Sequence, residues 1–258
     1  MKINNLFSVE GKVALVTGGS RGIGLMIARG FVENGVKTYI SSRKAEACDQ
    51  AVKELSQYGE CIALPADMSS MDEIERVAKE ISAKEQKLDI LVNNAGANWG
   101  APFAEFPENG WDKVMELNVK SPFFLTQKLL PLLQAAASNA DPARVINVGS
   151  INGINTPRVD TFSYPASKAA IHHLTKILAA HLTPENITVN AIAPGPFETK
   201  MMAGTLAARR QEILDNVPLG RTGEDEDMAG IALYLSSRAG AYVSGTVIPV
   251  DGGSLVNT

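Results

Sequence analysis

The chain has 258 residues, of which 45% are hydrophobic and 20% charged, and this is typical of one globular domain over residues 1–258. The net charge of −4, without a basic run, argues against a nucleic-acid partner. The N-terminus lacks a signal-peptide run and no window approaches the length of a membrane span, so we expect a cytoplasmic protein with no membrane partner.

The first predicted element is a buried parallel strand over residues 12–17, followed at once by Gly18, Gly22 and Gly24. A helix is expected over residues 25–34. Strand, glycine turn and helix together form a setting in which backbone N–H groups hold a pyrophosphate. The spacing T-G-x-x-x-G-x-G differs from the usual G-x-G-x-x-G fingerprint. The alternative is that these glycines only make a tight turn.

The second predicted strand, residues 37–41, ends in Ser42 and Arg43. Proteins of this kind that bind NAD usually carry an acidic residue near this point, where it bonds the ribose 2′-hydroxyl. An arginine suits a 2′-phosphate instead, and Arg21 in the glycine turn could add a second positive charge. We therefore predict NADP(H), with the alternative that Arg43 only begins a polar helix cap.

The remaining elements alternate between helix and strand. Helices are expected over residues 45–58, 70–85, 111–119, 123–137, 164–182, 203–216 and 225–235, and strands over 60–64, 89–92, 143–148, 187–192 and 246–250. This order predicts an α/β fold, a doubly wound parallel sheet of about seven strands with helices on both faces. Cys48 and Cys61 have no partners at ligand spacing, so we expect neither a metal site nor a disulfide.

Ser150, Tyr164 and Lys168 form a possible proton-transfer group near the start of the helix expected over residues 164–182. Tyr164 and Lys168 are four residues apart and so share one helix face. A neighbouring ammonium should lower the phenol pKa, so that Tyr164 could exchange a proton with a substrate oxygen. Taken alone, the pair could also be an ordinary tyrosine and lysine on an amphipathic helix.

Together these motifs resemble the short-chain dehydrogenase/reductase family over nearly the whole chain. The matching residues are Thr17-Gly18-x-x-x-Gly22-x-Gly24, Asp67, Asn93-Asn94-Ala95-Gly96, Asn118, Ser150, Tyr164-x-x-x-Lys168 and Pro194-Gly195. The resemblance implies a single Rossmann-like domain, hydride transfer with a nicotinamide cofactor, and a homotetramer or dimer. The stretch Gly-Ala-Asn-Trp-Gly-Ala after Ala95 is similar to that of bacterial NADPH-dependent 3-oxoacyl reductases of the rhamnolipid-associated type.

The resemblance also implies roles for single residues. Tyr164 would be the general acid, Lys168 would hold the nicotinamide ribose, Ser150 would bond the carbonyl oxygen, and Asn118 would anchor a water. Asp67 would face the adenine. The full set of implied cofactor contacts is Gly18, Ser20, Arg21, Gly22, Ile23, Gly24, Ser42, Arg43, Asp67, Met68, Asn94, Ala95, Gly96, Tyr164, Lys168, Pro194, Gly195, Phe197 and Thr199, with no metal.

The loops expected around the substrate are apolar with a basic rim. Their apolar residues are Trp99, Phe103, Phe106, Ile151, Ile154, Val159, Phe162, Phe197, Met201, Met202 and Leu206, and their cations are Arg158, Lys200, Arg209 and Arg210. This set suits a hydrophobic ketone or an acyl chain on an anionic carrier such as coenzyme A. Alternatively, the apolar residues pack on one another. We expect residues 197–217 to form a lid over the substrate.

Two departures from the family pattern bear on the substrate. Ser150 and Tyr164 are 14 residues apart, one more than in many relatives, so the loop at 151–162 should be slightly longer. The helix end at 134–138 is not basic, and residues 178–181 read Leu-Ala-Ala-His, which disfavours acyl carrier protein as a partner.

Three functions are compatible with these residues. The first is an NADPH-dependent reductase of a ketone or a 3-oxoacyl thioester. The second is a polyol or sugar dehydrogenase of the same family, and the third is a sensor that binds NADP(H) without catalysis. Such sensors typically lack a catalytic residue, and none is missing from this sequence.

Overall fold

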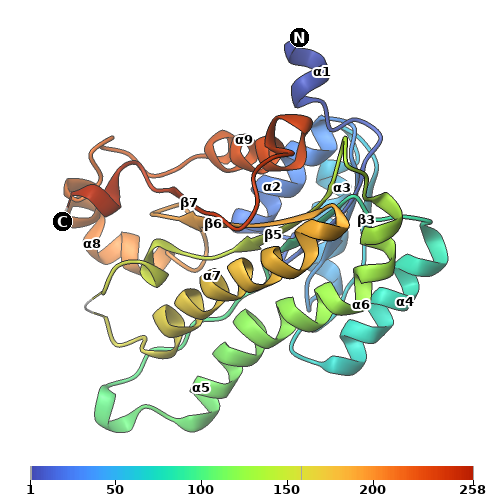
Figure 1. Cartoon of the computed structure of the whole chain (residues 1–258). Helices are drawn as coiled ribbons and strands as arrows, with labels where there is room; N and C mark the ends of the chain where they lie inside the picture. The colour runs from blue at the N-terminus through green and yellow to red at the C-terminus, as the bar shows by residue number, and fades with distance from the viewer. Residues whose placement is uncertain (1, 158, 258) are drawn as a thin grey trace.

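The fold is built on one parallel sheet of seven strands (Figure 1). The computed structural model describes residues 2–157 and 159–257. The strands lie in the order β3-β2-β1-β4-β5-β6-β7. Their bounds are β1 Val13–Thr17, β2 Lys37–Ser41, β3 Cys61–Ala63, β4 Ile90–Asn93, β5 Ala143–Val148, β6 Ile187–Pro194 and β7 Val247–Val250. The predicted fold class and strand count are confirmed.

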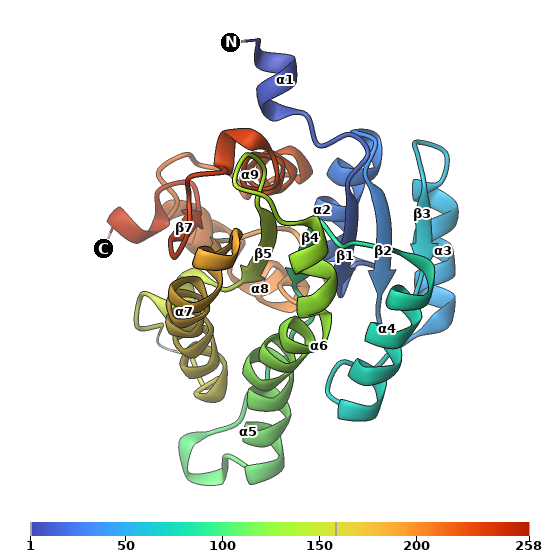
Figure 2. The same cartoon turned by 45° about the vertical axis from the view of Figure 1, so that its right-hand side comes forward.

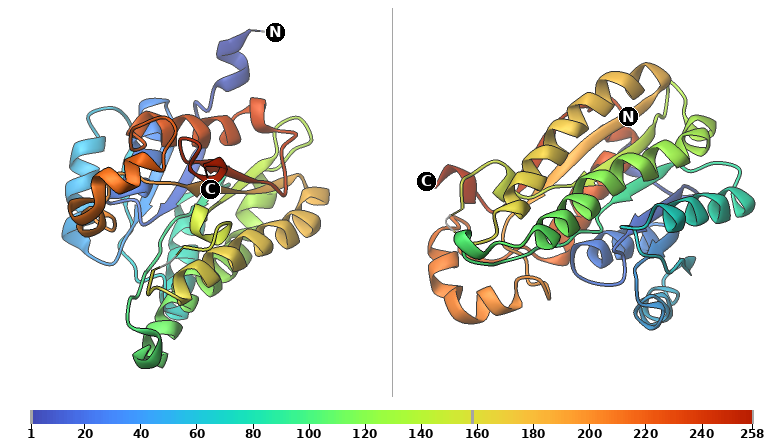
Figure 3. Two further views of the ribbon diagram at one scale, coloured as in Figure 1. Left: turned by 90° about the vertical axis from the view of Figure 1, so that its left-hand side faces the viewer. Right: turned by 90° about the horizontal axis from the view of Figure 1, so that it is seen from below.

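Helices cover both faces of this sheet (Figure 3). One face packs against α4 (Met71–Lys84), α6 (Ser121–Ala136) and α7 (Ser163–Leu182), and the other against α2 (Gly22–Glu33), α3 (Ala45–Leu55) and α9 (Asp225–Ser236). Side chains alternate along β1, so that Leu15 enters the first core while Ala14 and Val16 enter the second. Burial on both faces explains why the strands read as continuous apolar runs.

The strand order reverses between β1 and β4. From β1 the chain winds outward through β2 to β3, then returns to β4 on the other side of β1 and continues to β7 (Figure 2). In an open parallel sheet, loops diverge at such a point and leave a crevice at the carboxyl ends of the strands. The crevice of this chain therefore lies beside the ends of β1 and β4.

The two helices expected at 111–119 and 123–137 are continuous rather than separate. Helix α5 (Glu108–Met115) passes through a π-helical turn (Glu116–Lys120) directly into α6. Pro131 lies inside α6 without ending it, because the helix is held by an apolar face against the sheet. The wide turn absorbs one residue and carries Asn118 at its centre.

Smaller elements complete the chain. Two further helices are α1 (Ile3–Phe7), which the sequence did not predict and which projects at the top of Figure 1, and α8 (Ala203–Asp215), which is kinked at Arg209. Short 3-10 turns are η1 Phe103–Glu105, η3 Ile151–Gly153, η4 Thr183–Glu185, η5 Arg238–Gly240 and η6 Ser254–Val256. Cys48 and Cys61 are buried and free. None of the helices in the two described ranges is long and apolar enough to span a membrane.

Candidate functional site

The loops that follow β1 and β4 are locked together at the crevice. Thr17 Oγ1 accepts hydrogen bonds from the backbone N–H groups of Asn94 at 2.9 Å and Ala95 at 3.0 Å. The Asn94 side-chain amide donates in return to the Thr17 carbonyl oxygen at 2.8 Å. Two loops that are 77 residues apart in sequence thereby form one rigid edge.

The glycine turn after β1 forms an open cradle. Gly18 and Gly22 have φ values of +66° and +54°, which favour glycine. A Cβ at Gly18 would lie 2.7 Å from the Asn94 amide nitrogen, and one at Gly24 would overlap the same group. A Cβ at Gly22 would lie 3.3 Å from the Thr199 methyl carbon. Bare backbone at the start of α2, faced by Thr199, fits the pyrophosphate of a dinucleotide.

The two arginines assigned to the 2′-phosphate lie on neighbouring loops. Arg43 follows β2, Arg21 precedes α2, and both side chains are exposed. Ser42 is partly buried, with its Oγ 3.1 Å from the Cys48 thiol. Because β1 and β2 are adjacent, their loops share one edge of the crevice. The residues at this edge fit a 2′-phosphate.

The expected adenine contacts follow β3. The Asp67 carboxylate accepts from the Ser69 backbone N–H at 3.0 Å and from its hydroxyl at 2.7 Å, which holds the loop in a tight turn. Met68 is 2% exposed and its side chain lies in the core, so that side chain does not face the crevice.

Beyond β6, one expectation about the substrate pocket is wrong. The Phe197 ring is 2% exposed and packs under Gly223, within the core between β1, α2 and α9. The ring therefore does not line a pocket. Gly195 is required nearby because a Cβ there would lie 2.7 Å from Asp251.

Ser150, Tyr164 and Lys168 come together where β5 ends against α7. Lys168 is 5% exposed, and its Nζ donates to the Val148 carbonyl oxygen at 2.8 Å. The same Nζ lies 5.5 Å from the centre of the Tyr164 ring. The Ser150 hydroxyl is near enough to Tyr164 to lower the pKa of its phenol, and its Oγ accepts from the Asn152 backbone N–H at 3.1 Å.

Burial governs the pKa values of this group. It lowers the pKa of Lys168 to about 8, because the charged ammonium is removed from water. It raises the pKa of Tyr164 above its ordinary value, and the hydrogen bond from Ser150 opposes this only in part. The prediction that Lys168 lowers the phenol pKa is therefore wrong, since loss of solvation raises this pKa and the opposing effect comes from Ser150 rather than from the lysine.

Asn118 connects three parts of the site. Its amide oxygen accepts from the Ala97 N–H at 2.8 Å, and its amide nitrogen donates to the Ala97 carbonyl at 3.0 Å and to Ser167 Oγ at 2.9 Å. Ser167 donates in turn to the Tyr164 carbonyl oxygen at 2.7 Å. The loop after β4 is thus fastened to the first turn of α7. The predicted role of Asn118 in anchoring a water stays a prediction.

His172 is a buried residue of this region that sequence reasoning missed. Its Nε2 accepts from the Ser150 backbone N–H at 3.4 Å, and the side chain is 7% exposed. Burial lowers its pKa to about 4, with Lys168 and Lys176 adding to the effect. The sequence could have indicated His172 through its spacing from Lys168, because a residue four positions further along α7 lies on the same helix face.

The apolar loops partly pack on one another. Phe162 meets the rings of Phe103 and Phe106 edge to face, at centroid distances of 5.5 and 5.6 Å. The Ala101 N–H also donates to the Asp160 carbonyl at 3.0 Å, which joins the two loops. Phe103 nevertheless remains 81% exposed. Further exposed apolar side chains in these loops and the lid are Ile154, Val159 and Met201. Arg158 lies outside the described residues.

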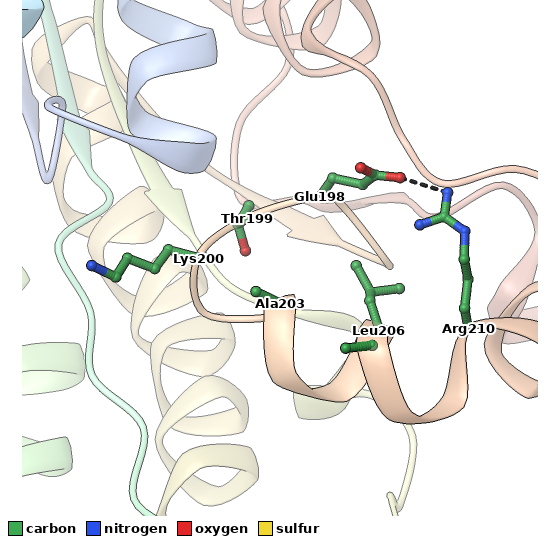
Figure 4. A pocket seen from close by; sticks show the side chains of 7 residues that line it. Glu198, Thr199, Lys200, Ala203, Leu206 and Arg210 are labelled. Atoms are coloured by element: carbon green, nitrogen blue, oxygen red, sulfur yellow. Dashed lines mark hydrogen bonds and ion pairs between the residues drawn. The ribbon is translucent and has the colours of Figure 1, made fainter.

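A cavity of about 510 Å³ lies between the loop after β6 and α8 (Figure 4). Its lining residues are Glu198, Thr199, Lys200, Ala203, Leu206, Ala207 and Arg210. Arg210 forms an ion pair with Glu198 at 2.6 Å, and Arg209 pairs with Glu212. Two of the four cations of the expected basic rim are thus neutralised, while Lys200 extends away from this ion pair.

Comparisons with known proteins agree with this geometry. The sequence model of the short chain dehydrogenase family matches residues 12–210. The chain is 49% identical over 251 residues to a rhamnolipids biosynthesis 3-oxoacyl-[acyl-carrier-protein] reductase of Pseudomonas aeruginosa, covering 96% of this chain and 97% of the relative. It is 34% identical over 257 residues to the 5-keto-D-gluconate 5-reductase of Escherichia coli, covering 98% and 99%. A solved Pseudomonas aeruginosa RhlG/NADP active-site complex superposes with a TM-score of 0.92 at 48% identity, covering 97% and 98%.

The depressed pKa of His172 makes stability depend on pH. Between pH 6.5 and about 4 the unfolded chain binds a proton at this residue that the folded protein does not. The free energy of unfolding should therefore decrease as pH falls through this window, by up to about 3 kcal/mol. Urea unfolding at several pH values should show a smaller decrease for His172→Gln. His173→Gln, a change at the exposed neighbour, should follow the wild type, and parallel curves for all three proteins would contradict the assignment.

Proposed function

The chain belongs to the short chain dehydrogenase family, and we propose on that basis that it reduces a ketone to a secondary alcohol with NADPH. The substrate is a hydrophobic ketone or a 3-oxoacyl thioester. The observation that carries this proposal is the grouping of Ser150, Tyr164 and Lys168, with the Lys168 Nζ 5.5 Å from the Tyr164 ring centre and Ser150 near enough to lower the phenol pKa.

The cofactor is NADP(H). A relative of known structure, 48% identical, is a complex with NADP. In this chain the backbone at Gly18, Gly22 and Gly24 would hold the pyrophosphate, and Arg21 and Arg43 would hold the 2′-phosphate. When bound, the reduced nicotinamide supplies a hydride to the substrate carbon.

Tyr164 supplies the proton that completes the reduction. Its raised pKa keeps the phenol protonated at neutral pH, which suits a general acid. The Ser150 hydroxyl would bond the carbonyl oxygen and fix its position. Lys168, whose pKa is about 8, can exchange a proton near neutral pH and would restore the phenol after each turnover.

The apolar loops favour a hydrophobic substrate. Phe103, Ile154 and Met201 are exposed at the edge where the strands end, and residues 197–217 would close over the substrate as a lid. Because Arg209 and Arg210 are paired with glutamates, the rim offers less positive charge than the sequence implies. Less positive charge at the rim weakens the case for an anionic carrier and favours a free hydrophobic ketone, and the non-basic helix ends at 134–138 and 178–181 disfavour acyl carrier protein. We expect a cytoplasmic homotetramer or dimer.

A substrate panel tests the proposed activity. Oxidation of NADPH, followed by its absorbance, should be faster with hydrophobic ketones and 3-oxoacyl thioesters of coenzyme A than with keto-sugars. Faster turnover of a keto-gluconate would favour the second candidate function, which rests on the resemblance to the 5-keto-D-gluconate reductase. Tight binding of NADPH without turnover of any compound would instead indicate a sensor.

Replacement of Tyr164 by phenylalanine tests the general acid. Tyr164→Phe should retain NADPH affinity but lose at least about 10²-fold in kcat, because the ring remains while the proton donor is removed. Tyr58→Phe, at an exposed position after α3, is the matched control and should leave kcat unchanged. Substantial turnover by Tyr164→Phe would mean that another group donates the proton.

Replacement of Arg43 by aspartate tests the cofactor assignment. Arg43→Asp should reduce kcat/KM for NADPH by about 10- to 100-fold and leave NADH less affected, because a charge-assisted bond to the 2′-phosphate is lost. Lys53→Asp makes the same charge change near the other end of α3 and should alter neither value. Equal use of the two cofactors by the wild type would overturn the assignment.

A further inference from the structure

The segment that presents Ser150 rests directly on α7. Ser150 leaves the end of β5 in an extended conformation and is followed by the 3-10 turn η3. Glycines flank it on both sides. A Cβ at Gly149 would overlap His172, and one at Gly153 would lie 2.5 Å from the Lys168 carbonyl carbon and 2.7 Å from the Ala169 nitrogen. The surface of α7 therefore determines where Ser150 can sit.

His172 is the α7 side chain that bonds to this segment. Its Nε2 accepts from the Ser150 backbone N–H at 3.4 Å, and a Cβ at Gly149 would overlap the same ring. The Gly153 backbone is also near enough to raise the pKa of the ring. The histidine thus lies against both ends of the turn that begins at Ser150.

The protonation state suits this bridge. A neutral imidazole has one acceptor and one donor nitrogen, and with Nε2 accepting, the proton lies on Nδ1. Burial and the nearby lysines disfavour the charged ring and lower its pKa to about 4, which favours the neutral form. An imidazolium would have two donors and could not accept from Ser150.

The bridge has a consequence for the Ser150 hydroxyl. Its oxygen already accepts from the Asn152 N–H at 3.1 Å, within the same turn. The single hydroxyl proton is left to donate, toward Tyr164 in the free protein and to the substrate oxygen when substrate is bound. This arrangement requires the backbone of residues 150–153 to keep its position, and His172 holds that backbone at Ser150 while the α7 backbone packs against it at Gly153.

We propose that His172 is a positioning residue for the reduction, which acts through Ser150 by fixing the turn that carries its hydroxyl. The inference rests on the proposed function, because it assumes that Ser150 bonds the reacting carbonyl. His172 touches neither substrate nor cofactor in this role. Its removal should lower kcat and leave NADPH affinity unchanged.

A double-mutant cycle separates positioning from general packing. His172→Leu fills a similar volume without polar atoms and should lower kcat about 10-fold, since a small misplacement of a reacting group is costly. Ser150→Ala should lower kcat about 10²-fold. The double variant should be no slower than Ser150→Ala alone, because the histidine then has no hydroxyl to position.

Rescue and control variants complete the experiment. His172→Gln keeps an acceptor and a donor and should recover most of the lost kcat. His173→Leu makes the same change at the exposed neighbour and should have no effect. Thermal unfolding and NADPH binding confirm folding of each variant. If leucine prevents folding, the more flexible His172→Met replaces it.

The kcat values of these variants separate a failure of the inference from a failure of the proposed function. The inference is overturned if His172→Leu has the kcat of the wild type. It is also overturned if the double variant loses a further 10-fold in kcat relative to Ser150→Ala, or if His172→Gln is as slow as His172→Leu. These results leave the proposed reduction intact if Tyr164→Phe and Ser150→Ala are inactive. Full activity of Ser150→Ala would overturn both the role of Ser150 in the proposed function and the inference.

Discussion

The hydrogen bond from Lys168 Nζ to the Val148 carbonyl oxygen is the contact on which the site depends. It fastens α7 to the end of β5, two residues before Ser150 and one helical turn after Tyr164. The same contact requires the ammonium to be buried, and burial lowers its pKa to about 8. One interaction therefore sets both the geometry of the group and the pH range in which the lysine can exchange a proton.

Glycines at points of close approach are the second constraint on the site. Gly18 and Gly24 leave room for the Asn94 amide, Gly96 leaves room beside Asn118 and Lys168, and Gly149 leaves room for His172. At each position a Cβ would contact a polar group of another loop or helix. The glycines thus do more than permit turns, because they allow the ends of β1, β4 and β5 to approach one another closely. A dinucleotide crevice with a reacting centre beside it requires these strand ends to lie close together.

The segments that would cover the substrate are held by weaker contacts than the strand ends. Within residues 197–217, the loop after β6 is held to α8 by exposed ion pairs such as Glu198–Arg210, and exposed pairs contribute little stability. The loops at 97–107 and 151–162 meet through the ring of Phe162. Rigid strand ends hold the catalytic group, while weaker contacts hold the surface that would select the substrate. This division is consistent with relatives that are named for different substrates.

The sequence by itself determined the strand and helix order, the glycine cradle and the grouping of Ser150, Tyr164 and Lys168, because these depend on local periodicity and fixed spacing. Most element boundaries agreed within a few residues, although the join at Glu116–Lys120 did not, since a π turn has no clear sequence signal. Only the tertiary structure decided the sign of the Tyr164 pKa shift, the burial of Phe197, the pairing of Arg210 and the contact of His172 with Ser150. Each of these depends on solvation or on neighbours distant in the chain, which spacing along one segment does not reveal.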